Sequence, residues 1–460
     1  MRHFVLRLSW TYPVAMLGLV CILLGSLIPP FMSPDEVDHV KRAYWLSQGK
    51  IILDTEPGQS SGGQVDTGLM QYINSYYLTF MKERNHKMTA AEMAQAPTFK
   101  WSGTKVYSSA PGTGYYLPIT YAPQAAGLGI GRAFNFSVDT SYKLARAFSL
   151  VAAIAILYFA IALFEMGPLA AALLLLPMTL FQFSSASLDG VTNAMAVLAI
   201  SLFLHLSKYR RDALTWTSTG LAVVVFILVT SRAHLLPMLA LPFAAFYYTR
   251  ERRTLVMAAF ASVVTLIWLA IAVHYTVDMR VVTGASTGEI VKHYLFRPWE
   301  FLQVVYNTLA NPIVRNYYSV AFIGNLGWLD TPIYPGSYTK ICYMLALLLL
   351  LSLKLKQLRR NLVARAMLAA CGVLSVLLTF FAILVTYNAF PATEIQGVQG
   401  RYFLVPAIML AYAMAFSEDE TSGIRRVVSY LMLGAFFVYS AYCTIKLVVD
   451  KYYIISSVTG

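Results

Sequence analysis

The sequence predicts an all-α polytopic membrane protein with about eleven transmembrane helices and a large first loop outside the membrane. Two observations support this prediction. The 460 residues are 58% hydrophobic and only 12% charged, with a mean hydropathy of +0.60, whereas a soluble domain carries about a quarter charged residues. The apolar residues also gather in segments close to the length of about 20 residues that a helix needs to cross a bilayer.

The chain has a formal net charge of +13. In a soluble protein this excess would suggest binding to nucleic acid, but the short cytoplasmic loops of membrane proteins collect Lys and Arg. We therefore expect the lipid bilayer and no nucleic acid as a partner. The four cysteines lie within apolar segments, so the sequence predicts neither a disulfide framework nor a CxxC metal site. They are Cys21, Cys342, Cys371 and Cys443.

The first apolar segment covers residues 10–31 and follows Arg2 and Arg7. It is too long for a signal peptide and lacks a small-x-small cleavage site, so we interpret residues 1–31 as an uncleaved first transmembrane helix. Residues 32–140 are hydrophilic and are expected to form an extracytoplasmic subdomain. Within them, residues 115–132 are apolar but broken by two prolines, and we expect a helix lying at the membrane interface.

The rest of the chain divides into three parts. Residues 141–275 are expected to hold transmembrane helices 2 to 7, residues 276–337 a second long outer loop, and residues 338–460 helices 8 to 11. The expected spans after the first are residues 142–164, 168–184, 191–206, 216–230, 233–248, 255–275, 338–353, 362–387, 403–416 and 427–449.

Three basic loops set the expected orientation, because they fall on the same side as the N-terminus. Their basic residues are Lys208, Arg210, Arg211, Arg250, Arg252, Arg253, Lys354, Lys356, Arg359 and Arg360. Basic loops stay in the cytoplasm. The sequence therefore predicts a cytoplasmic N-terminus and an extracytoplasmic C-terminus.

An acidic cluster follows the first expected helix directly. Proline cannot continue a helix, so the prolines at the start of this segment place the cluster at the membrane surface. The prolines are Pro29, Pro30 and Pro34, and the cluster is Asp35, Glu36, Asp38 and His39. Acidic residues after a helix are commonly solvated loop side chains, and that alternative stays open.

Other polar residues occur at the outer ends of later spans. They are Arg146, Asp189, Arg232, Gln399, Arg401 and Tyr402. Simpler interpretations are a helix N-cap for Asp189, a snorkelling side chain for Arg232 and an interface anchor for Arg401.

Acids and arginines at one membrane surface suit the transfer of a sugar from a polyprenyl phosphate. The reaction needs a base to take the proton of the acceptor hydroxyl and cations to hold the phosphate, and arginine binds phosphate oxygens in pairs. We therefore assign catalysis to Asp35, Glu36 and Asp189. We assign substrate binding to the other polar residues of the two groups, namely Asp38, His39, Arg146, Arg232, Gln399, Arg401 and Tyr402. Carboxylates also bind divalent metals, so a metal cofactor stays open.

Three motifs resemble those of a bacterial membrane family known as a domain of unknown function, DUF2142. They are S-P-D-E-V-D-H from Ser33 to His39, F-I-G-N-L-G-W-L-D-T from Phe322 to Thr331 and V-Q-G-R-Y-F-L-V-P from Val398 to Pro406. That family is similar in layout to the GT-C glycosyltransferases, which use polyprenyl-phosphate sugars outside the cytoplasmic membrane. The resemblance implies a GT-C-like fold in the bacterial cytoplasmic membrane.

The resemblance also implies roles for single residues. Asp35 or Glu36 would match the first-loop carboxylate of the GT-C enzymes, and Asp189 the second-loop acid of some members. Arg401 would contact the donor phosphate or sugar. Trp328 and Asp330 either shape the acceptor site or pack against the membrane surface.

The sequence thus leads us to expect an inverting glycosyltransferase that moves one sugar from a polyprenyl-phosphate-linked donor to a cell-surface glycan acceptor, such as lipopolysaccharide O-antigen. A flippase or transporter of lipid-linked saccharides is an alternative, although the middle of each span is nearly all apolar, unlike the polar or broken helices of transporters. A polysaccharide polymerase or ligase is another, although that class tends to place its largest outer loop late in the chain.

Overall fold

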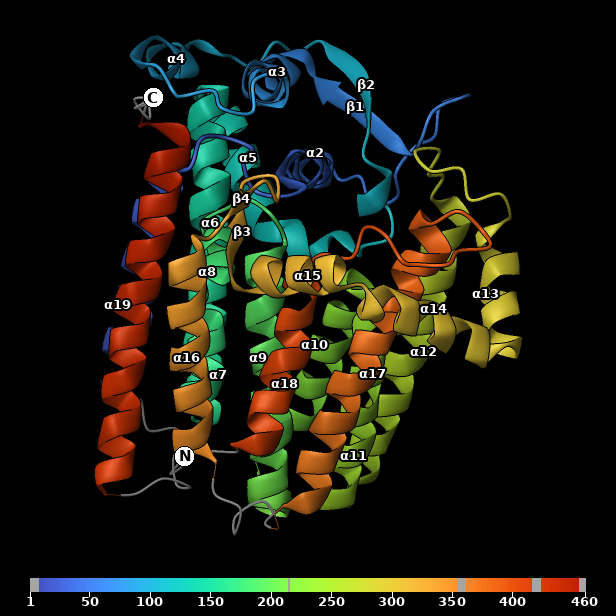
Figure 1. Cartoon of the computed structure of the whole chain (residues 1–460). Helices are drawn as coiled ribbons and strands as arrows, with labels where there is room; N and C mark the ends of the chain where they lie inside the picture. The colour runs from blue at the N-terminus through green and yellow to red at the C-terminus, as the bar shows by residue number, and fades with distance from the viewer. Residues whose placement is uncertain (1–7, 214–215, 354–358, 360, 416–422, 455–460) are drawn as a thin grey trace.

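The computed structural model describes residues 8–213, 216–353, 359, 361–415 and 423–454. Over these residues the protein is mostly helical, with nineteen α-helices and four short strands (Figure 1). Five basic residues that entered the expected orientation lie outside the described residues. They are Arg2, Arg7, Lys354, Lys356 and Arg360.

Six helices are long and apolar enough to cross a membrane. They are α6 (Val138–Leu163), α9 (Asp189–Tyr209), α12 (Arg252–Tyr275), α16 (Pro335–Ser352), α17 (Leu362–Tyr387) and α19 (Ile424–Tyr452). Three shorter apolar helical stretches occur at expected spans. They are Pro13–Leu27 within α1 (Leu8–Leu27), α10 (Thr217–Ser231), and Gly400–Met414, which includes α18 (Leu404–Met414). The fold is therefore that of a helical membrane protein.

Two expected spans are not continuous helices. The span expected at residues 168–184 consists of α7 (Pro168–Leu174) and α8 (Pro177–Phe183), and the span expected at 233–248 is a 3₁₀ segment (Ala233–Leu239) followed by α11 (Ala240–Thr249). Pro177 at the start of α8 and Pro237 within the 3₁₀ segment lack the backbone N–H that a continuous helix needs. Apolar composition led us to expect one continuous spanning helix in each segment, and it did not predict the breaks.

An outer layer covers one end of the upright helices (Figure 1). It is formed by α2 (Glu36–Ser47), β1 (Gly62–Asp66), α3 (Thr67–Lys82), α4 (Ala90–Gln95), β2 (Lys105–Ser109) and α5 (Ala122–Ala133). The strands pair antiparallel, from Gly62 opposite Ser109 to Asp66 opposite Lys105. Asp66 caps α3 and also accepts from the backbone of Ser102 and Gly103, which fixes the turn before β2.

A second set of short elements lies at the same end of the bundle (Figure 1). It consists of α13 (Thr287–Phe296), α14 (Pro298–Ala310) and α15 (Pro312–Gly324), followed by the hairpin of β3 (Asn325–Leu326) and β4 (Thr331–Pro332). Ile290 and Val304 from this set form a small separate core with Phe380 and Leu384 of α17. The second long loop is thus anchored to a spanning helix.

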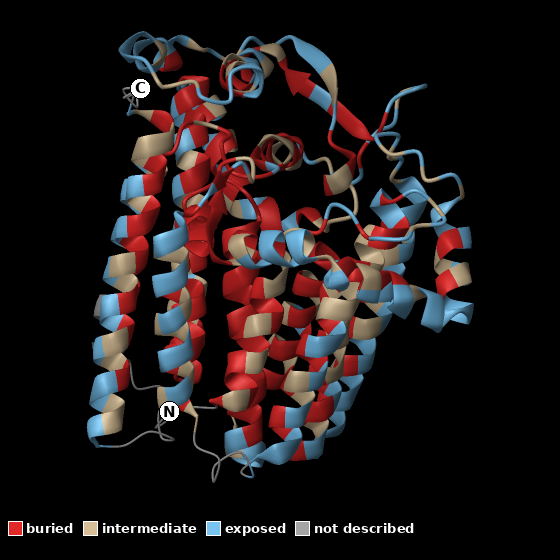
Figure 2. Ribbon diagram, in the orientation of Figure 1, coloured by how far each residue is buried: buried red, intermediate tan, exposed pale blue. Residues whose placement is uncertain are grey.

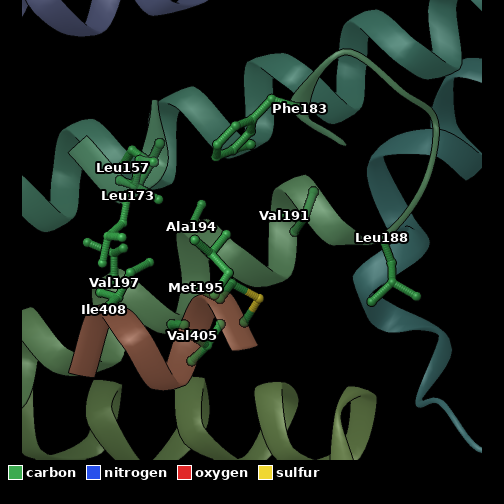
Figure 3. Close-up of a cluster of buried hydrophobic side chains, with 14 of the residues drawn as sticks. Leu157, Leu173, Phe183, Leu188, Val191, Ala194, Met195, Val197, Val405 and Ile408 are labelled. Carbon is green, nitrogen blue, oxygen red and sulfur yellow. The ribbon is translucent and has the colours of Figure 1, made fainter. Parts of the chain in front are cut away.

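The main core surrounds α9, whose apolar stretch is buried throughout. Figure 2 shows burial concentrated in the middle of the bundle and exposed surface on α12, α16 and α19. Figure 3 shows how Ala194 and Val197 of α9 pack beside Leu157, Leu173 and Ile408 from three other helices. Exposed apolar residues on the outer helices suit lipid contact, because lipid replaces water around the spans.

Glycines let α5 and α6 approach closely. A Cβ on Gly127 would lie 2.6 Å from the backbone nitrogen of Ala145, whereas a Cβ on Gly129, two residues along the same helix, would meet only the side chain of Ser47 at 3.8 Å. The expected interfacial helix at residues 115–132 is therefore packed tightly between α2 and α6.

Gly127→Ala is expected to lower the free energy of unfolding by about 1 to 3 kcal/mol, because the added methyl group overpacks a backbone contact. Gly129→Ala is the matched control and is expected to be neutral or to stabilise by up to about 1 kcal/mol through helix propensity. Thermal unfolding of the purified protein in detergent measures both. Equal melting temperatures for the two variants would contradict the close packing of α5 on α6.

Candidate functional site

The loop between α1 and α2 has an unusual backbone. Phe31 and Asp35 adopt left-handed conformations, with φ of 65° and 59°. Such conformations cost about 1 to 3 kcal/mol each for residues other than glycine and persist where the surroundings impose them. The indole of Trp328 donates to the carbonyl of Phe31 at 3.0 Å, so the second long loop helps to hold the first.

Glu36 is the main anchor of this loop. Its side chain is fully buried, and its two oxygens accept five hydrogen bonds. The donors are the backbone N–H groups of Ser33 and Ala186, the hydroxyl of Tyr142, and Nε and Nη2 of Arg146. Both carboxylate oxygens are therefore used within the protein, and Glu36 has the geometry of a structural residue.

Arg146 completes the anchor from α6. Besides its pair with Glu36, its guanidinium donates to the carbonyls of Gly25, Ile28 and Pro29. These carbonyls stand at the end of α1, where a helix leaves its last C=O groups without partners. The buried pair thus closes α1 and fixes where Asp35 begins α2.

Asp35 belongs to a different network, which alternates acids and arginines. Arg401 donates through Nη2 to Asp35 Oδ2 at 2.5 Å and through Nη1 to Asp189 Oδ2 at 2.9 Å. The other oxygen of Asp189 accepts from Arg232. We call Asp35, Asp189, Arg232 and Arg401 the charge array. It joins the first loop to the starts or ends of α9, α10 and α18.

Within the charge array, Asp35 is the member open to solvent. Its side chain is 55% exposed, while those of Asp189, Arg232 and Arg401 are 6%, 10% and 2% exposed. The structure gives Asp35 Oδ1 no hydrogen-bond partner among the described residues. Asp35 therefore offers a carboxylate oxygen to a ligand, and Glu36 does not.

The charges around Asp35 set its protonation. Enclosure by the protein acts to raise the pKa of the Asp35 carboxyl, but the positive charge of Arg401 and the contributions of His39 and Arg232 outweigh it, so the pKa lies below its usual range. The carboxylate is consequently ionised throughout the neutral range.

Arg401 is held in place from several sides. Gln399 Oε1 accepts from its Nε at 2.7 Å, and the carbonyl of Pro34 accepts from Nη1 at 3.3 Å. The neighbouring Gly400 passes so close to the backbone of Phe322 in α15 that a Cβ there would clash. The glycine of the V-Q-G-R-Y motif is thus what allows Arg401 to reach the two acids.

The charge array lies inside the part of the chain that a known family covers. The family model described as "Predicted membrane protein (DUF2142)" matches residues 17–411. The chain belongs to the DUF2142 family. Comparisons with curated proteins and with solved structures return no match.

Aromatic and histidine side chains border the charge array of this DUF2142 protein. The guanidinium of Arg232 lies 5.7 Å from the ring of Tyr116, and that of Arg401 lies 5.4 Å from the ring of Tyr402, within the range of cation–π attraction. His39 is buried, and its Nδ1 lies 2.8 Å from the hydroxyl of Tyr121. Burial, with the charges of Arg232 and Arg401, outweighs the opposing charge of Asp35 and lowers the pKa of His39 to about 3.

The remaining predicted site residues lie away from the charge array. Asp38 forms an ion pair with Lys41 at 2.8 Å. Trp328 and Asp330 belong to the β3–β4 hairpin, where Asp330 accepts from the backbone of Trp328 and from Lys451. They line a separate pocket next to the end of α19.

Sequence reasoning overlooked two residues of the DUF2142 site. Tyr142 lies four residues before Arg146, so the two share one face of α6, and both donate to Glu36. Tyr121 lies within the apolar 115–132 segment, where the sequence alone does not separate a site residue from an interface anchor. Helix periodicity from Arg146 was the one signal that would have found Tyr142.

A metal site is not evident in the part of the chain that the structure describes. No group of three or more His, Cys, Asp or Glu side chains there is arranged to hold an ion. Asp35 and Asp189 are instead joined through a shared arginine.

Arg146→Met is expected to lower the free energy of unfolding by about 3 to 5 kcal/mol, because it leaves the buried charge of Glu36 without its partner. The control is Lys143→Met on the same helix, whose ion pair with Asp139 involves a side chain 67% exposed and is worth at most about 1 kcal/mol. Membrane protein level and melting temperature report the difference. Two variants of equal stability would show that the Glu36 anchor is not structural.

Acidification is expected to destabilise the protein through His39. Its folded pKa of about 3 lies below the ordinary 6.5, so the unfolded chain binds the extra proton between these values and stability falls as pH drops through this window. The loss is up to about 1.4 kcal/mol per pH unit. Melting temperatures between pH 7.5 and 5 should fall less for His39→Gln than for the wild type. Parallel pH curves would rule out His39 as the source.

Proposed function

We propose that this protein is a membrane glycosyltransferase that moves a sugar from a polyprenyl-phosphate donor to a cell-surface glycan. The observation that carries the proposal is the accessible carboxylate of Asp35, which pairs with Arg401 in a charge array that also contains Arg232. In the proposal the charge array faces the extracytoplasmic side of a bacterial cytoplasmic membrane, and the N-terminus is cytoplasmic.

The proposed topology is GT-C-like. It retains eleven spans, of which two are interrupted by proline, and places the outer layer and the α13–α15 segment outside the membrane. Non-helical backbone inside a bilayer is tolerated where the surrounding protein buries it. The residues of α7 and α8 are buried in the bundle. The breaks therefore do not argue against crossing.

Asp35 is proposed as the base. Its free Oδ1 accepts the proton of an acceptor hydroxyl as that oxygen attacks the anomeric carbon of the donor sugar. The bond between the anomeric carbon and the phosphate oxygen breaks, and polyprenyl phosphate leaves with the electron pair. One displacement of this kind inverts the anomeric configuration.

The two arginines have different proposed tasks. Arg401 uses all three of its nitrogens on Gln399, Pro34, Asp35 and Asp189, so it positions the acids. Arg232 donates to Asp189 through one nitrogen, and the structure gives its other nitrogens no hydrogen bond to described residues. These free donors suit the phosphate that becomes more negative as the bond breaks.

The location of the charges favours transfer over transport. Charged side chains of the site gather at one end of the bundle, and the α9 core between the ends is apolar except for small polar residues. A transporter instead carries its binding site near the bilayer midplane, at broken helices. The interrupted helices here are packed with apolar side chains.

Asp35→Asn is expected to reduce transfer by about 10²- to 10⁴-fold, the usual contribution of a general base. The variant protein should still accumulate, because Arg401 retains its ion pair with Asp189. Asp54→Asn, in the same outer segment with a side chain 57% exposed, is the control and should transfer normally. Mass spectrometry of surface glycans and of lipid-linked donors, in these strains and in a deletion strain, measures the effect.

The expected result is loss of one sugar increment and accumulation of donor in the deletion and Asp35→Asn strains alone. If the glycan changes in the deletion strain but is normal in the strain that carries Asp35→Asn, then Asp35 is not the base. Accumulation of the donor on the cytoplasmic leaflet would instead favour a flippase.

A further inference from the structure

A second pocket lies outside the charge array, at the outer ends of α3 and α19. It has a volume of about 420 Å³, within the range of small-molecule sites, and combines apolar, aromatic and charged side chains. Its lining includes Met32, Arg84, Trp328, Asp330, Lys451 and Tyr452. Nothing in the mechanism above uses it.

The pocket contains a tyrosine hydroxyl without a hydrogen-bond partner among the described residues. Tyr452 is 2% exposed and lines the pocket, yet its hydroxyl has no hydrogen bond to any described residue. Gly327, with φ of 62°, keeps space beside it, because a Cβ there would lie 3.1 Å from the Tyr452 hydroxyl. The hydroxyl is thus available to a bound molecule.

The charges of the pocket favour an anion. Asp330 is paired with Lys451 at 3.1 Å, and this pair is neutral as a whole. Arg84 adds a positive charge whose guanidinium has no carboxylate partner among the described residues. Arginine binds carboxylate and phosphate in a planar, paired geometry, so the pocket suits a ligand with an acidic group.

The pocket is also linked to the first loop. Met32 lines it, and Asp35 follows three residues later, so their Cα atoms are at most about 11 Å apart. Trp328, which contributes an aromatic surface, binds the carbonyl of Phe31 and lies against Tyr77 with ring centroids 4.6 Å apart. Aromatic surface with a few convergent polar groups is typical of sites for small polar ligands.

We propose that this pocket binds an acidic saccharide unit of the acceptor glycan, with Arg84 on its acidic group, the Tyr452 hydroxyl on a sugar oxygen and Trp328 against the ring. The role as an acceptor site rests on the proposed function. The binding of an acidic saccharide does not depend on it.

The test uses the full-length protein purified in detergent, without donor, titrated with trigalacturonate and with the neutral trisaccharide maltotriose. Calorimetry or saturation-transfer NMR is expected to give at least tenfold tighter binding of trigalacturonate. Arg84→Ala and Tyr452→Phe should each weaken that binding at least fivefold. Lys82→Ala removes an exposed cation at the end of α3, two residues before Arg84, that does not line the pocket. This variant should leave the binding unchanged.

Three results would overturn the site. The first is no binding of either probe, and the second is equal binding of both. The third is an equal loss of trigalacturonate affinity in Arg84→Ala and Lys82→Ala, because equal losses would indicate general charge attraction. Asp35→Asn separates this proposal from the previous one, because it should abolish transfer while leaving trigalacturonate binding intact. Normal binding with no transferase phenotype in the deletion strain would keep the pocket and reject the transferase.

Discussion

The guanidinium of Arg401 is the interaction on which the arrangement of the outer face depends. It bridges Asp35 and Asp189, which come from the first loop and from the start of α9. Burying a charge is unfavourable unless partners surround it. Two acids alternate with two arginines, so the charge array is neutral as a whole. This neutrality allows Asp189, Arg232 and Arg401 to remain buried beneath the outer layer. Asp35 is the point where this network opens to solvent.

Two adjacent acids therefore have opposite environments. Glu36 is fully buried and saturated with hydrogen bonds, and it locks the loop to α6 through Arg146. Asp35, one residue earlier, has a left-handed backbone and does not cap α2 with its side chain. The strained backbone turns its carboxylate toward Arg401 instead. The rigid neighbour thus supplies the geometry that the exposed acid needs.

The rest of the fold supports this arrangement from a distance. The buried α9 carries Asp189 at its first turn, and the packed helices around it leave that residue little freedom. Two parts of the second long loop contact the site region. Helix α15 packs closely against Gly400, and Trp328 donates a hydrogen bond to the carbonyl of Phe31. Elements far apart in the sequence consequently meet at one end of the helical bundle.

The sequence by itself determined the class of protein and the ends of most of the long apolar helices. Apolar segments predict α6, α9, α12, α17 and α19 within a few residues, because a bilayer imposes length and composition on each span. Motif reasoning also selected all four residues of the charge array. Pro177 and Pro237 were the sequence signals for the two breaks, because proline lacks the N–H of a continuous helix, but the mainly apolar composition around them led us to expect unbroken spans.

The tertiary structure alone decided which of these residues act together. Asp35 and Glu36 are equivalent in a sequence pattern, but one faces solvent and the other is enclosed by Tyr142 and Arg146. Trp328 and Asp330 were predicted either to shape an acceptor site or to pack against the membrane surface, and in the structure they line a pocket apart from the charge array. Pairings of this kind depend on how distant helices pack, and local periodicity and charge contain no information about those distances.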